Sequence, residues 1–199
     1  SVNSPGDNHL SRRDARRAHV QAITANLAEF HTPISPAAAA RGFRGWHSRG
    51  YLPHFDVPDM VQAVTFRLVD SLPADVVARL TALPDSPAKR TLREETLDRA
   101  RGACWLRRPE IAQLVEDALL HFDGERYRLC AWCVMPNHVH TLFEITTTPL
   151  GEIVKSWKGY TAREANRLLG RQGAFWEEEY WDRFMRDERH FRDTVSYIE

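Results

Sequence analysis

The sequence has few cysteines, no long apolar run and no net charge. Three cysteines among 199 residues form an odd, sparse set, which argues against a disulfide framework and favours a reducing compartment. No stretch reaches the roughly 18 apolar residues of a membrane span, and the polar start lacks the apolar core of a signal peptide. We therefore expect a soluble, cytoplasmic protein without a membrane partner.

A net charge of zero does not by itself exclude a charged binding partner. Lys and Arg number 27, as do Asp and Glu, yet binding depends on local fields and not on totals. Residues 1–55 carry seven arginines against Asp7, Asp14 and Glu29, a surplus of +4, and the rest of the chain has a matching deficit. A nucleic-acid partner therefore remains compatible with this composition.

The N-terminal part differs in composition from the rest. Residues 11–30 have alanines at helical spacing and clustered arginines, which predicts a basic amphipathic helix. Residues 31–45 combine two prolines with a run of small residues, which is typical of a connector outside the core. We predict an appended region at 1–45 and a main domain at 46–199.

The main domain alternates strand and helix patterns. Between the first two strands, the helical segments are expected to cross back over the sheet. The order strand, helix, strand, strand, helix, strand, helix predicts an α+β, ferredoxin-like or RRM-like βαββαβ sandwich with an antiparallel sheet. Its predicted strands span 61–70, 127–135, 138–145 and 175–185, and its later helices span 109–122, 150–170 and 187 to the end.

The most informative motif starts the third of these strands. Residues two apart in a strand point to the same face, so His138 and His140 present two imidazoles side by side after the polar Asn137. Two such imidazoles can hold one divalent cation. The alternative is a pair of structural histidines.

A zinc site is a competing interpretation, because Cys130 and Cys133 have the spacing of zinc ligands. Their odd separation would place them on opposite faces of a regular strand, where they could not share an ion. We expect both to be small packing residues.

Four separated blocks resemble one known family in order. Together with GWHSRGYLPHFD and the following VTFRL, the blocks VMPNHVH, SWKGYTAREANRLLG, FWEEEYWDRFMRDERHF and TVSYIE make the chain similar to the REP-associated tyrosine transposases. These are relatives of the single-tyrosine HUH transposases of insertion sequences. The resemblance covers about residues 45–199.

The resemblance implies a bacterial enzyme that cuts and rejoins single-stranded DNA at palindromic hairpins through a 5′-phosphotyrosine. It implies His138 and His140 as ligands of Mg²⁺ or Mn²⁺ and Tyr197 as the nucleophile, with Tyr160 as the alternative nucleophile. Relatives take a further ligand one helical turn beyond the tyrosine. Here Glu199 and Asn137 are the candidate substitutes, since the sequence stops two residues after Tyr197.

DNA contacts are expected from two segments. The mixture of aromatic and basic side chains near residue 50 suggests that Arg49, Tyr51 and His54 read a short single-stranded tag beside the hairpin, although such aromatics also pack on cores. A net charge of +3 on the helix at 150–170 favours a phosphate track, although charged faces are often merely solvated. The residues of that track are Lys155, Lys158, Arg163, Arg167 and Arg171.

Two other functions remain open at this point. The first is a hairpin-binding protein, domesticated or truncated, with little or no cleavage. The second is an RRM-like RNA binder, although the sequence has no RNP-type motif. A monomer and a homodimer are both compatible with the sequence.

Overall fold

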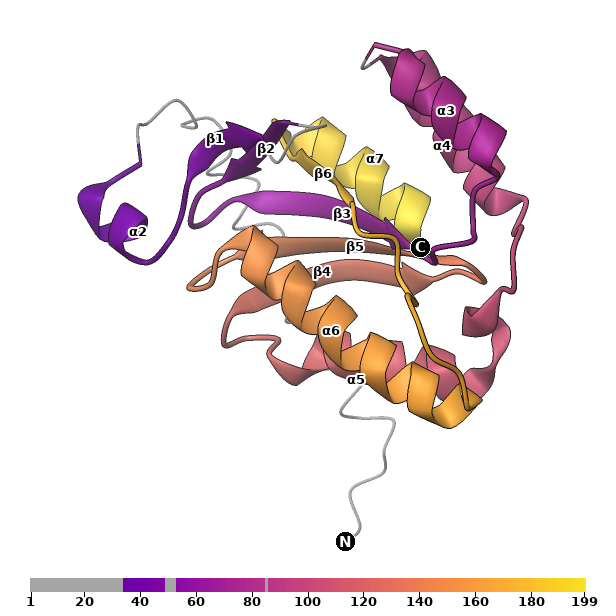
Figure 1. Cartoon of the computed structure of the whole chain (residues 1–199). Coiled ribbons are helices and arrows are strands. Elements are labelled where there is room, and N and C mark those ends of the chain that lie inside the picture. Colours follow the sequence, from indigo (N-terminus) through magenta and orange to yellow (C-terminus); the bar gives the residue numbers. More distant parts are fainter. Residues whose placement is uncertain (1–33, 49–52, 85) are drawn as a thin grey trace, which may run out of the picture.

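A computed structural model describes residues 34–48, 53–84 and 86–199 (Figure 1). Its centre is a four-stranded antiparallel sheet of order β4-β5-β3-β6. The strands are β3 (Val61–Arg67), β4 (Tyr127–Val134), β5 (His138–Ile145) and β6 (Trp181–Phe184). With α5 (Pro109–His121) before β4 and α6 (Leu150–Leu169) after β5, the predicted ferredoxin-like α+β fold is confirmed.

The two faces of the sheet are covered by different helices. α5 and α6 lie on one face, and α7 (Glu188–Ile198) lies on the other (Figure 1). On β5, Val139 and Phe143 belong to the large core under α5 and α6, whereas Leu142 packs with Phe191 of α7. Since side chains alternate along a strand, His138 and His140 lie on the same face as Leu142, toward α7.

The helices on both faces begin and end where the sequence predicts. α6 ends at Gly170, whose φ of 62° is the left-handed conformation that a glycine C-cap supplies. α7 begins after Asp187, whose carboxylate accepts a hydrogen bond from the His190 amide at 2.8 Å. Burial of Phe191 and Ile198 fixes the rotation of α7 and leaves Tyr197 half exposed beside the sheet.

A helical hairpin stands between β3 and α5 at one end of the sheet (Figure 1). It consists of α3 (Ala74–Ala82) and α4 (Pro87–Asp98), and Leu97 is fully buried against its other leucines. The Arg93 guanidinium lies 4.5 Å from the centre of the Trp181 ring on β6. The prediction that all helical segments here cross the sheet is wrong for α3 and α4, because their apolar residues are enough to form a separate small cluster.

Two smaller predictions need correction. Residues 34–44 were expected to be a connector outside the core, but they include the helix α2 (Pro36–Ala40), and Phe43 is buried in the main core. The last strand is confined to Trp181–Phe184, because the segment before it makes only one bridge, from Trp176 to Leu68. Before β3, the strands β1 (Gly45–Ser48) and β2 (Pro53–Asp56) pair antiparallel.

The described residues do not test two predictions for the N-terminal part of the chain. The helix at 11–30 falls outside the described residues, and the boundary near residue 45 stays a prediction. Among the described helices, none is long and apolar enough to cross a membrane.

The predicted placement of Cys130 and Cys133 on opposite faces of a strand is also wrong. The pairing of β4 with β5 shifts between Leu129 and Ala131, so the regular alternation is lost at Cys130. Cys130 and Cys133 consequently pack against the same cluster on the α7 side. Both are free thiols, and they serve as the packing residues that the sequence predicted.

Candidate active site

The two histidines of β5 converge on one point. Their Nε2 atoms lie 2.9 Å apart, and their ring planes are nearly perpendicular at 88°. His138 is 1% exposed and His140 7% exposed, so the surrounding packing limits both rings.

Asn137 fixes the orientation of His138. Its side-chain Nδ2 donates to the carbonyl oxygen of Arg101 at 3.0 Å, which leaves its Oδ1 facing His138 Nδ1 at 2.8 Å. An amide oxygen only accepts hydrogen bonds, so His138 carries its proton on Nδ1 and a lone pair on Nε2. Asn137 therefore positions the His138 ring, and its amide is already engaged.

Thr65 holds His140 in a comparable way. On the neighbouring strand β3, Thr65 pairs with His140 in the sheet register, and its Oγ1 lies 2.9 Å from His140 Nδ1. A hydroxyl can donate or accept, so either tautomer of His140 is satisfied. When Thr65 accepts from Nδ1, the lone pair of His140 Nε2 is also available for a cation.

Both histidines are held neutral, which metal ligation by imidazole requires. Burial lowers the pKa of His138 from 6.5 to about 3, with a further contribution from His140. Burial, together with the positive charge of Arg93, lowers the pKa of His140 to about 4. The two Nε2 atoms thus fit one divalent cation. Within the described ranges, no group of three or more His, Cys, Asp or Glu side chains is arranged to hold a metal ion.

Tyr197 lies over this histidine pair. Its ring centre is 5.3 Å from that of His140, and the two planes meet at 77°. Tyr197 is 50% exposed, so its ring is open to a partner from solvent. Burial of its inner part, followed by the charges of Glu94 and Asp98, raises the pKa of Tyr197 to about 12. The hydroxyl is therefore protonated at neutral pH.

The alternative tyrosine lies elsewhere. Tyr160 belongs to α6, whose buried side chains pack on the face of the sheet opposite the histidines. It is 44% exposed on that helix. The sheet thus separates Tyr160 from His138 and His140, whereas Tyr197 contacts His140.

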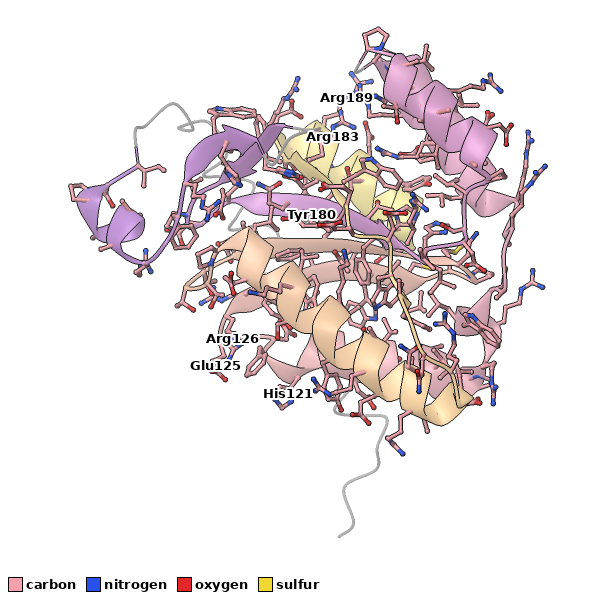
Figure 2. The ribbon with its side chains drawn as sticks, viewed as in Figure 1. His121, Glu125, Arg126, Tyr180, Arg183 and Arg189 are labelled. Atoms are coloured by element: carbon pink, nitrogen blue, oxygen red, sulfur yellow. The ribbon has the colours of Figure 1, made fainter. Side chains whose placement is uncertain are left out.

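A groove of about 470 Å³ opens beside His140 and Tyr197. Its lining combines four arginines with aromatic rings, namely Arg90, Arg93, Arg183, Arg186, Trp46, Phe55, Trp181 and Phe184. Trp46 is 62% exposed, and its ring centre lies 4.7 Å from that of Phe55. Three carboxylates also line the groove, of which Asp182 contacts the buried His54 and Asp193 lies 3.9 Å from Arg189. Figure 2 shows Arg183 and Arg189 on the α7 side, away from Arg126.

The residues predicted to bind DNA are placed differently. His54 is 1% exposed and contacts Asp182, so the prediction that it reads a DNA tag is wrong; the imidazole is part of the packing between β2 and β6. Arg49 and Tyr51 lie outside the described residues. The predicted phosphate track on α6 lies across the sheet from the histidines and stays a prediction; its residues are Lys155, Lys158, Arg163, Arg167 and Arg171.

Several residues of the site were not predicted. Thr65, Arg90 and Arg93 stand in no motif that singles them out in the sequence. Trp46 was noted as part of an aromatic segment, but the groove beside it depends on β6 and α7. Only tertiary contacts bring these residues together. Glu199 is exposed after the end of α7.

Comparison with known proteins relates part of the chain to one family. Residues 108–199 match the model of the family "Transposase IS200 like". The resemblance to single-tyrosine transposases is thereby confirmed for this part of the chain. The family region contains His138, His140 and Tyr197, whereas Thr65 and Arg101 precede it. No curated protein is a significant match.

Two solved structures are similar to the chain. One is a REP-associated tyrosine transposase bound to a REP hairpin, with 14% identity and a TM-score of 0.44, covering 76% of this chain and 68% of that one. The other is a putative transposase from Deinococcus radiodurans R1, with 17% identity and a TM-score of 0.36, covering 76% of this chain and 92% of that one.

Proposed function

We propose that this protein is a metal-dependent endonuclease and strand transferase for single-stranded DNA, with Tyr197 as its nucleophile. The observation that carries the proposal is the contact between Tyr197 and His140, whose ring centres lie 5.3 Å apart on the α7 side of the sheet. The match of residues 108–199 to a transposase family supports the same chemistry. Burial of the imidazoles beside an exposed tyrosine suits a site that receives its substrate from solvent.

The proposed reaction is a transesterification. The phenol oxygen of Tyr197 attacks the scissile phosphorus and loses its proton, while the bond between phosphorus and the 3′ oxygen breaks. The departing 3′ oxygen takes up a proton, and the downstream strand stays joined to Tyr197 through its 5′ phosphate. One phosphodiester replaces another, so a 3′ hydroxyl can reverse the step without another energy source.

His138 and His140 would hold Mg²⁺ or Mn²⁺ through their Nε2 atoms, with Asn137 and Thr65 keeping the rings in place. When bound, the cation supplies positive charge to a non-bridging phosphate oxygen and to the attacking phenol oxygen. Such help is needed because the pKa of Tyr197 is raised to about 12. Arg93, whose charge lowers that pKa, would act in the same direction.

The groove supports single-stranded DNA as the substrate class. Exposed aromatic rings can stack on unpaired bases, and arginines can pair with phosphates. The groove beside Tyr197 offers both within one volume of about 470 Å³. Trp46 is the ring best placed for stacking, since it is 62% exposed.

We further propose palindromic hairpins of the REP type as the natural substrates. The exposed cations of α6, on the opposite face, would then contact the paired stem, while the groove takes the unpaired strand. The alternative function is that of a hairpin-binding protein that cleaves little. Such a protein would bind DNA with the same surfaces, but its Tyr197 would react little with the bound DNA.

One assay separates these functions. The full chain is incubated with Mn²⁺ and a pool of DNA hairpins with randomised single-stranded flanks, labelled at either the 3′ or the 5′ end. We expect a covalent adduct that survives denaturation and carries only the 3′ label, because the downstream fragment stays on the enzyme. The 5′-labelled fragment should be released with a free 3′ hydroxyl.

Matched variants assign the nucleophile. Tyr197→Phe should abolish the adduct, whereas Tyr160→Phe, which changes a similarly exposed tyrosine on the other face, should retain it. Loss on Tyr160→Phe alone would contradict the proposal. Hairpin binding without any adduct would favour the alternative function.

A further inference from the structure

We infer that Asp98 is a third ligand of the cation that His138 and His140 hold. The inference rests on the proposed function in one respect, because it uses the same metal site. Asp98 is the last residue of α4, and it precedes the family region at 108–199, so the family match does not assign it a role.

The distances fit a shared ion. Two ligands that each bind an ion at about 2.1 Å are about 3.0 Å apart when they are at right angles and at most about 4.2 Å apart when they are opposite. The two Nε2 atoms are 2.9 Å apart, which matches a right-angled pair. Asp98 Oδ1 lies 3.9 Å from His138 Nε2, too far for a hydrogen bond but within the span of two ligands of one ion.

The turn that carries Asp98 is tied to the histidine pair. The Asn137 side chain accepts a hydrogen bond from His138 Nδ1 through its oxygen and donates one to the Arg101 carbonyl through its nitrogen. This one amide therefore joins His138 to the segment that follows Asp98. The neighbouring Leu97 is fully buried. The backbone position of Asp98 is therefore fixed on both sides.

The same turn is held from a third direction. The Ala103 amide donates to Asp70 Oδ2 at 2.8 Å, and Gly102 has a φ of 88° with no room for a side chain, since an added Cβ would lie 2.6 Å from the Asp70 carbonyl oxygen. The Asp98 side chain is 50% exposed, so it is free to rotate over the short remaining distance. A fixed backbone with a rotatable carboxylate is a suitable arrangement for completing a site when a cation arrives.

The chemistry of the donor set favours a carboxylate here. Mg²⁺ and Mn²⁺ prefer oxygen ligands, and two neutral imidazoles supply neither oxygen nor negative charge. Asp98 supplies both. Glu94, one helical turn earlier on α4, lines the groove near Tyr197, and Glu199 is exposed beyond α7, so these two residues are the natural comparisons.

Mn²⁺ binding to the full chain without DNA tests the inference. Isothermal titration, with electron paramagnetic resonance to count free Mn²⁺, measures affinity independently of cleavage. We expect one site in the wild type, at least tenfold weaker binding in Asp98→Asn, and unchanged binding in Glu94→Gln and Glu199→Gln. His138→Ala together with His140→Ala should abolish binding. Circular dichroism checks that each variant is folded, and Asp98→Glu, which keeps the carboxylate, should recover part of the affinity.

The outcomes distinguish this inference from the proposed function. If Asp98→Asn binds Mn²⁺ as the wild type does, the inference is overturned while the histidine site stands. Weakening by Glu199→Gln in its place would assign the third ligand to the C-terminal residue and also overturn it. If the wild type binds no Mn²⁺, both the inference and the metal-dependent part of the proposed function fail.

Discussion

His138 and His140, two residues apart on the same face of β5, direct their Nε2 atoms at each other across 2.9 Å. Such proximity is favourable only while one of the facing nitrogens donates a proton to the other, or while a cation lies between them. Two protonated imidazoles at this distance would repel each other inside a buried site. The arrangement therefore makes the folded protein sensitive to acid.

We predict that stability falls as the pH drops below about 6.5. The pKa of His138 is lowered from 6.5 to about 3 and that of His140 to about 4, so the unfolded chain binds more protons than the folded one between those limits. Between about pH 6.5 and pH 5, each histidine should cost about 2 kcal/mol of unfolding free energy. Urea denaturation at the two pH values measures the loss, and replacing both histidines by glutamine should flatten it. An equally steep loss in that variant would contradict the explanation.

We predict that Glu94→Gln speeds adduct formation. The negative charge of Glu94 raises the pKa of Tyr197, so its removal should lower that pKa and increase the reactive phenolate several-fold. Arg93→Gln should have the opposite effect, because the Arg93 charge lowers the same pKa. Single-turnover rates at several pH values measure both. Equal rate changes in the same direction would show that the charges act on folding or on DNA and not on the phenol.

We predict that Trp46→Ala weakens binding of single-stranded DNA by between about fivefold and a hundredfold. Loss of one stacking ring costs about 1–3 kcal/mol. Tyr160→Ala, which removes a similarly exposed ring from α6, should leave that affinity unchanged. Fluorescence anisotropy with a labelled, unstructured oligonucleotide measures both variants. Equal affinities of wild type and Trp46→Ala would move the stacking surface away from the groove.

We predict that the arginines of the groove and those of α6 contact different parts of the DNA. Arg183→Ala and Arg186→Ala should each lower the slope of affinity against salt concentration by about 0.7 for an unpaired strand. Arg163→Ala and Arg167→Ala should change that slope only when the DNA contains a hairpin stem. A uniform effect of all four on unpaired DNA would contradict the division between the two faces.

We predict that Gly102→Ala destabilises the protein more than Gly124→Ala. Both glycines have positive φ, at 88° and 85°, so each substitution should cost about 1 kcal/mol through the backbone. Only at Gly102 would the new Cβ collide with a neighbour, at 2.6 Å from the Asp70 carbonyl oxygen, whereas Gly124 has open space. Thermal denaturation compares the two. Equal losses would mean that the Asp70 turn yields without cost.

Local patterns were enough to predict much of the fold. The alternation on β5, the glycine after α6 and the aspartate before α7 are each decided within a few residues, and the structure has all three as predicted. The wrong predictions are those in which tertiary packing overrides the local sequence pattern. The shift at Cys130 reversed the side of one thiol, and burial of Phe43 drew a proline-rich segment into the core.

The candidate site was predicted in part for the same reason. His138 and His140 are two residues apart, so strand geometry alone places them together, and the family resemblance supplied Tyr197. Thr65, Arg101 and Trp46 reach the site only through sheet register and hairpin packing, which no short window of sequence encodes. His54 was misjudged because its burial depends on Asp182, which is far away in the sequence.

The hydrogen bonds of the Asn137 amide also affect which part of the chain could be moved onto another protein scaffold. A graft that moved residues 108–199 onto another scaffold would carry both histidines and the tyrosine. It would leave behind the Arg101 carbonyl that accepts from Asn137 and the Thr65 hydroxyl that contacts His140. Such a chimera would inherit the reactive groups without the contacts that orient them. The smallest portable unit of this centre therefore extends back to β3, well before the region shared with the family.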